Sequence, residues 1–339
     1  MKGIKYFTLS LASLFFTGCG GTDDAELSPD TPVGFSASVA DITRRSGETT
    51  TDNLTSLGIF ACYTGKNDWA EVNVPNYMYN QKVERSNASS PWTYSPVKYW
   101  PNNSSDKITF FAYAPYADGV SGHLSFSEKT DGGSPVLTYT VPVAENDRID
   151  LVAAVPLMNY SYHSTTDGKL SLVMHHVLTR VIFKIKNGES HTSKTVTSLT
   201  LSAPSGGTMT FRVPAGGESP CSWSNIQKNI TFTSALSSGT PVAVEDTEKA
   251  LADFFLIPVG VPTSVTLTLG YTYARKGSTG AGTAATKTVT LPASPQWTPG
   301  ISTVYTLLLS TEEVSVETSA SISWTDGGTT EGELDTAIP

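Results

Sequence analysis

The residues best suited to chemistry are a pair of histidines and a small charged group. His175 and His176 are adjacent, so on a strand their side chains point to opposite faces, and no cysteine or carboxylate stands at metal-ligand spacing beside them. We expect them to be structural and hydrogen-bonded. Asp147 and Asp150 flank Arg148 and could act as acid and base, but isolated loop carboxylates are usually solvated. Hydrolase, zinc-peptidase and phosphate-loop motifs are absent, so we predict no enzyme activity, no cofactor and no metal.

The N-terminus has the pattern of an export signal. Lysines precede an apolar run at residues 6–16 that is too short to span a bilayer, so residues 1–18 are predicted to be removed. The residues before Cys19 resemble a lipobox, which would make Cys19 the lipid-carrying (palmitate) N-terminus of a surface-exposed outer-membrane lipoprotein. The alternative is an ordinary signal peptide with a chance cysteine.

Two further cysteines, Cys62 and Cys221, lie far apart in the sequence. They could form a disulfide in an exported protein, but two buried free thiols are the favoured interpretation.

Length and composition predict an all-β protein. The chain has 339 residues, more than one hydrophobic core usually holds, so we expect two domains. Helical periodicity is scarce, whereas short runs rich in β-branched and aromatic residues recur between turn residues. The 22 Lys and Arg against 31 Asp and Glu give a formal net charge of −9, which offers no support for nucleic-acid binding.

The most strongly patterned stretch predicts a β-hairpin at the centre of the fold. Two aromatic-rich runs, residues 92–100 and 107–113, are separated by turn residues at 101–106. In the second run large side chains point to both faces of the expected strand, so we predict a central strand between two packed layers.

An earlier stretch predicts a strand with one buried face, followed by an accessible loop. Its alternating apolar residues are Val33, Phe35, Ala37 and Val39. Residues 41–52 are polar and include Arg44 and Arg45, so this loop is a candidate protease target.

Three blocks in order, residues 76–83, 92–101 and 110–115, together with a histidine ahead of Leu178-Thr179-Arg180, resemble the Bacteroidetes fimbrillin superfamily, the subunits of type V pili. The expected architecture is two tandem transthyretin-like β-sandwich domains. We expect a signal peptide at 1–18, a lipidated tether at 19–31, an N-terminal domain at 32–165 with a removable first strand at 33–42, and a C-terminal domain at 166–339.

The resemblance also implies a mode of assembly. In that family an Arg-directed protease cuts after the first strand, and a strand of a neighbouring subunit then fills the groove. By position Arg45 is the best candidate, with Arg44 next and Ser46 as the new N-terminus. The alternative is two solvated arginines in an uncut loop. The implied partners are other pilus subunits, the outer membrane through the lipid, and a host or bacterial receptor.

The C-terminal segment bears on the kind of subunit. Residues 322–324 resemble the last strand of the family, and the tail beyond Trp324 is nearly devoid of apolar residues, so a further donor strand is not expected there. This favours a minor or tip-like subunit of the fimbrium over a stalk subunit, although residues 314–324 could themselves be the donor. A second hypothesis is an uncleaved lipoprotein that binds glycans through Trp69, Tyr77 or Trp297. For these three aromatics we prefer the interpretation that they pack in the core or in hairpins.

Overall fold

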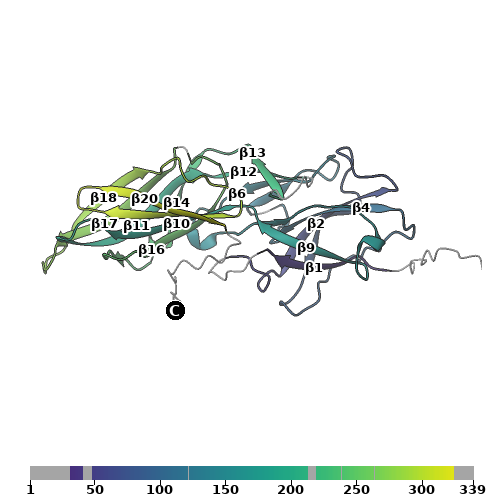
Figure 1. Cartoon of the computed structure of the whole chain (residues 1–339), viewed down its shortest axis with the longest axis horizontal. Coiled ribbons are helices and arrows are strands. Elements are labelled where there is room, and N and C mark those ends of the chain that lie inside the picture. The colour runs from purple at the N-terminus through teal and green to yellow at the C-terminus, as the bar shows by residue number, and fades with distance from the viewer. Residues whose placement is uncertain are drawn as a thin grey trace, which may run out of the picture.

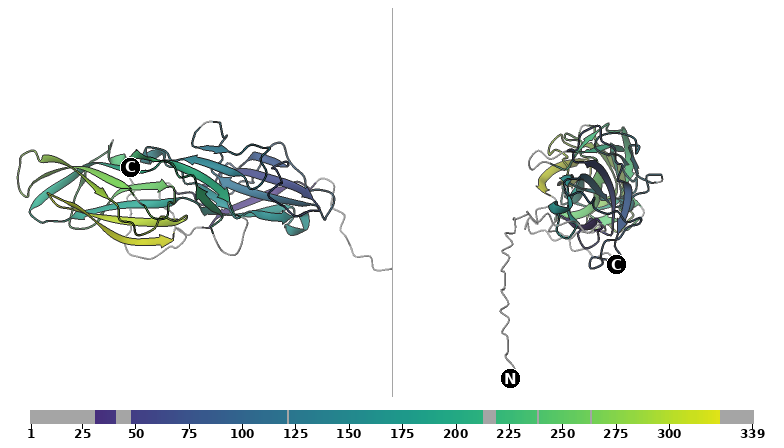
Figure 2. Two further views of the ribbon diagram at one scale, coloured as in Figure 1. Left: turned by 90° about the horizontal axis from the view of Figure 1, so that it is seen from above. Right: turned by 90° about the vertical axis from the view of Figure 1, so that its right-hand side faces the viewer.

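The described part of the chain is built almost entirely of β-strands. The computed structural model describes residues 31–40, 48–120, 122–212, 219–237, 239–262 and 264–323. These residues form twenty strands and three single-turn 3₁₀ helices, η1 (Glu145–Asp147), η2 (Tyr162–Ser164) and η3 (Ala235–Ser237), which confirms the all-β prediction. Within these ranges no helix has the length and apolar character needed to cross a bilayer. The molecule is elongated, with β1, β2, β4 and β9 towards one end and β16, β17, β18 and β20 at the other (Figures 1 and 2).

The first sheet has the order β1-β9-β7-β4-β2-β3, with β8 also paired to β4. Its strands are β1 (Gly34–Val39), β2 (Ser56–Gly65), β3 (Met78–Glu84), β4 (Lys107–Ala114), β7 (Val152–Ala154), β8 (Leu157–Tyr160) and β9 (Lys169–His176). The pair β1 and β9 is parallel, and the other pairs in this sheet are antiparallel.

Strand β4 is a central strand with both faces buried, as its pattern predicts. Phe110 belongs to one apolar cluster, together with Phe35 of β1, whereas Phe111 belongs to the other. The predicted hairpin, however, is wrong. Residues 92–100 contain isolated bridges instead of a continuous strand, and β4 pairs with β2, β7 and β8. Prolines at 91, 96 and 101 explain this, since proline has no N–H to give to a ladder.

A second sheet, in the order β13-β12-β6-β5, packs against the first. Its strands are β5 (Leu124–Phe126), β6 (Val136–Thr140), β12 (Gly206–Phe211) and β13 (Cys221–Ser224). The contact of Phe111 on β4 with Phe211 on β12, at 5.4 Å between ring centroids, is representative of the core between these sheets.

The other end of the molecule contains two more sheets, ordered β16-β10-β19-β20 and β14-β11-β17-β18, with β15 also paired to β11. Their strands are β10 (Thr179–Asn187), β11 (Thr192–Pro204), β14 (Asn229–Thr233), β15 (Val242–Ala243), β16 (Lys249–Leu256), β17 (Thr266–Arg275), β18 (Thr283–Thr290), β19 (Ile301–Leu309) and β20 (Val314–Ser323). Phe183 and Tyr305 stack at 5.7 Å in this core.

Sheet membership does not divide the chain at residue 165. Strand β9 lies between β1 and β7 in the first sheet, and β12 pairs with β6 in the second, although both follow the expected boundary. Local sequence patterns specify strands but not the partners that long-range pairing selects. The number of domains therefore stays a prediction.

The two described cysteines are buried and free, which confirms the free-thiol interpretation. Burial raises the pKa of Cys62 to about 11 and that of Cys221 to about 12.

Candidate functional site

Strand β1 is an edge strand paired along its length with one neighbour. The parallel pairing with β9 runs from Gly34 opposite Lys169 to Val39 opposite Met174. At its N-terminal end a short antiparallel bridge ties the preceding residues to the segment before β4. There Val33 N donates to Lys98 O at 2.8 Å, and Trp100 N donates to Thr31 O at 2.9 Å. An edge strand of this kind can leave with the loss of one ladder and this short bridge.

The buried face of β1 fills an apolar groove. Val33, Phe35 and Val39 are 1%, 7% and 6% exposed. The Phe35 ring makes edge contacts with Tyr94 at 5.6 Å and with Phe110 at 6.4 Å. At ~1.5–3 kcal/mol for each large side chain, three such residues contribute about 5–9 kcal/mol to holding the strand.

The groove is covered by the loop that follows β3. Tyr94 donates its hydroxyl to Val33 O at 2.8 Å, and Trp100 donates its indole N–H to Gly168 O at 2.9 Å. Tyr94 therefore holds the first residue of the predicted removable strand, and Trp100 holds the residue that precedes β9.

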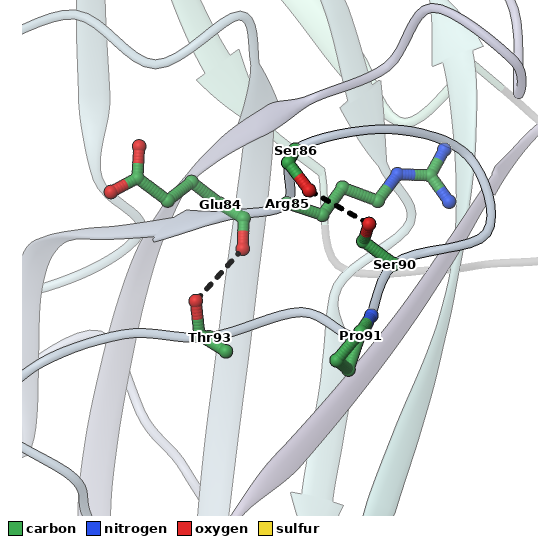
Figure 3. Close-up of a pocket in the computed structure, with 6 residues that line it drawn as sticks. All are labelled: Glu84, Arg85, Ser86, Ser90, Pro91 and Thr93. Atoms are coloured by element: carbon green, nitrogen blue, oxygen red, sulfur yellow. Dashed lines mark hydrogen bonds between the residues drawn. The ribbon is translucent and has the colours of Figure 1, made fainter.

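A shallow pocket lies in this covering loop (Figure 3). Its polar groups are bonded to one another: Ser86 Oγ lies 2.7 Å from Ser90 Oγ, and Thr93 Oγ1 donates to Glu84 O at 3.3 Å. Arg85 turns its guanidinium to Trp92, 4.7 Å from the ring centroid, and its Nε donates to Leu54 O at 2.7 Å. These contacts among the residues around the pocket stabilise the loop over the groove, and we assign the pocket no ligand.

Glu48 lies within the stretch at 41–52 that the sequence predicts to be an accessible loop, yet it is 2% exposed. The prediction of accessibility is therefore wrong at this residue, because a distant partner holds its carboxylate in the interior. The Glu48 carboxylate accepts a hydrogen bond from Arg180 Nη1, and the Nε of Arg180 lies 2.9 Å from each carboxylate oxygen of Asp253. Sequence reasoning missed this group. The available signal was weak, because nothing in the local pattern distinguishes a buried glutamate from a solvated one.

The predicted processing and lipid residues lie outside the described residues. Cys19 precedes the first described residue, and Arg44, Arg45 and Ser46 fall between residues 40 and 48. The structure describes β1 before these residues and the chain from Glu48 onwards after them.

The histidine and aspartate predictions have different outcomes. His176 is structural and hydrogen-bonded, as expected, with its Nδ1 3.0 Å from Asp150 Oδ1. The expectation that Asp150 is solvated is wrong, since it is 4% exposed and this buried partner stabilises it. Burial and then the neighbouring His176 lower the pKa of His175. Among the described residues no group of three or more potential ligands is placed to hold a metal ion.

The three aromatics proposed as glycan platforms do not share a groove. Trp297 is fully buried and donates its indole N–H to Tyr305 Oη at 3.0 Å. Trp69 is half-buried against Phe111 at 5.8 Å, and the hydroxyl of Tyr77 donates to Tyr99 O. Their packing matches the preferred structural interpretation.

Comparisons with known proteins place this chain in a family. The family model described as fimbrillin-like matches residues 43–324. The fimbrium subunit Fim1C of Phocaeicola vulgatus is 31% identical over 192 residues, which span 52% of this chain and 50% of that protein. The chain thus matches about half the length of this curated relative.

Among solved structures, a fimbrial protein from Bacteroides vulgatus superposes with a TM-score of 0.63 at 23% identity, covering 87% of this chain and 99% of that one. This likeness shows a shared fold. The relatives are fimbrial proteins and not enzymes. The extent of the family match decides the assignment: this chain belongs to the fimbrillin-like family.

Proposed function

We propose that this protein is a subunit of a surface fimbrium that accepts a strand from a neighbouring subunit in place of β1. The observation that carries the proposal is the position of β1, an edge strand whose apolar side chains fill a groove while its backbone pairs with β9 alone among the strands described. Removing such a strand exposes apolar surface and unpaired backbone groups, and another extended segment can satisfy both.

The proposal includes export and processing. The protein is made as a lipoprotein, held at the outer membrane by acyl chains on Cys19, and is then cut by an Arg-directed protease after Arg45 or, failing that, Arg44. Support comes from the sequence around these residues and from the position of the two arginines shortly after β1. Cys19→Ala should abolish incorporation of labelled palmitate in cells while leaving the folded portion unchanged.

We assign the protein a minor, tip-like role because its last described strand is engaged in its own sheet. Strand β20 pairs with β19 from Val314 opposite Leu309 to Ser323 opposite Ile301, so donating it would require opening that ladder. One sequence feature favours the opposite role: Ser-Ala-Ser occurs at the centre of β1 (residues 36–38) and again in β20 (residues 319–321).

A peptide-capture experiment tests the proposal. The purified protein is treated with an Arg-specific protease, the new N-terminus is determined, and labelled peptides of residues 33–42 and 314–324 are added. We expect Ser46 as the new N-terminus and capture of the 33–42 peptide by cut protein only. Capture of the 314–324 peptide as well would replace the tip-like role with a stalk role. A chain that stays intact, or binds neither peptide when cut, contradicts strand exchange.

A further inference from the structure

A buried charge cluster ties Glu48, three residues after Arg45 in the predicted processing loop, to the opposite half of the molecule. Arg180 on β10 contacts both Glu48 and Asp253 of β16, and the exposed side-chain fractions of these three are 6%, 0% and 18%. Strands β10 and β16 belong to the half of the molecule away from β1 (Figure 1). The Glu48 carboxylate therefore links the start of the chain after the loop to a different sheet from the one that holds β1.

The next residue is fixed by a second contact. Thr49 N donates to Asp150 Oδ2 at 2.7 Å, and Thr49 Oγ1 donates to Asp150 O at 2.9 Å. The other oxygen of Asp150 lies 3.0 Å from His176 Nδ1 on β9. Asp150 is thus oriented by His176 and presents its second oxygen to the backbone of Thr49.

The segment also closes on itself. Asn53 Nδ2 donates to Glu48 O at 2.6 Å, and Thr50 N donates to Asn53 Oδ1 at 2.7 Å. Leu54 then enters the apolar cluster beneath the groove. We call residues 48–54 the anchor segment.

We propose that the anchor segment is a stability unit separate from β1, held by Arg180 and Asp150, so that strand exchange removes β1 and leaves residues 48–54 in place. This inference rests on the proposed function for its biological meaning. Its physical basis is independent of cleavage. Strand β1 is held by the ladder to β9 and by the groove, whereas the anchor segment is held by buried charges from β10 and the 145–151 region and by Arg85 of the covering loop. Separately held segments can open separately.

Contact between the two units is present but small. Val39 N donates to Thr51 Oγ1 at 2.9 Å, and both Val39 and Leu54 belong to the same apolar cluster. Breaking one neutral hydrogen bond affects stability far less than removing one member of a buried ion pair, which leaves the other charge without compensation.

The functional consequence concerns the groove that is empty after β1 has left. Because the anchor segment stays in place, the end of the groove next to it keeps its position, and residues 48–54 do not move into the groove. These residues then do not compete with an incoming strand for the groove.

Hydrogen exchange read by mass spectrometry tests the separation on the full, uncut chain. Glu48→Gln should speed exchange in residues 48–54 roughly a hundredfold and leave residues 33–40 within about threefold of wild type. Phe35→Ala should speed exchange in residues 33–40 and leave residues 48–54 within about threefold of wild type. Glu71→Gln, at an exposed position, is the matched control and should change neither. If the Glu48→Gln chain unfolds globally, Thr49→Val, which keeps every charge, should still loosen residues 48–54 selectively.

Two results would overturn the proposal. One is that both segments accelerate together in every variant, which would make β1 and the anchor segment one cooperative unit. The other is that residues 48–54 lose protection in wild-type protein once it has been cut and β1 has left. Since the first comparison uses uncut protein, it stays decisive even when no protease cuts the chain and strand exchange fails.

Discussion

Replacing Phe35 by alanine is the most direct test of whether β1 is part of the packed structure. The ring is 7% exposed and contacts Tyr94 and Phe110. Phe-to-Ala changes in cores cost about 3–5 kcal/mol. Because β1 is an edge strand beside loops that can partly close the space, we expect a loss of about 3 kcal/mol, roughly a third to three fifths of the ~5–9 kcal/mol that Val33, Phe35 and Val39 contribute together.

The assay is guanidinium denaturation of the intact chain, followed by tryptophan fluorescence. Phe35→Ala should lower the midpoint of the first transition without changing its slope, while Phe35→Leu should recover most of the loss because it refills the space. Ser38→Ala, an exposed position on the same strand, is the control and should be close to neutral. If Phe35→Ala, like the control, lowers the free energy of unfolding by less than about 0.5 kcal/mol, then β1 is not held by its groove and the reasoning fails.

Three further predictions follow from other parts of the fold. Gly58→Ala should destabilise the first sheet by about 1–3 kcal/mol or more, because an added Cβ would lie 2.1 Å from the Tyr113 ring. Thermal unfolding measures this loss, with Gly280→Ala as the control because a Cβ there meets no close atom. Equal melting temperatures for the two variants would contradict the prediction. Hydrogen bonds from the hydroxyls of Thr311 and Thr192 lower the pKa of Glu189 to about 2, so its contribution to stability is present above the unfolded pKa of about 4.3 and is lost as pH falls towards 2. Glu189→Gln should therefore be less stable than wild type at pH 7 and match it near pH 2, and a difference independent of pH would refute this. Burial raises the pKa of Cys62 to about 11 and that of Cys221 to about 12. In a Cys19→Ser chain, neither thiol should therefore react with iodoacetamide at pH 8 until denaturant is added. Mass spectrometry counts the labels, and labelling of the native chain would contradict the burial of these thiols.

The sequence alone determined the features that depend on local patterns. Alternation of apolar residues predicted a strand at 33–42, within which the structure has β1 (Gly34–Val39), while residues 41 and 42 lie outside the described residues. Apolar side chains at consecutive positions identified β4 as a strand with two buried faces. Both inferences work because successive side chains on a strand alternate between faces, so the polarity of alternate residues indicates which faces of the strand are buried.

Tertiary structure decided which strands pair and which charges are buried. The run at 92–100 is rich in strand-forming residues, yet its prolines and the pairing of β4 with β2 leave it as a covering loop. Strand β9 joins β1 across more than a hundred residues. The partner of Glu48 lies 132 residues away, and that of Asp150 lies 26 residues away. A carboxylate is stable in the interior only where a partner compensates its charge. For Glu48 and Asp150 tertiary folding supplies that partner, and no local pattern specifies the pairing.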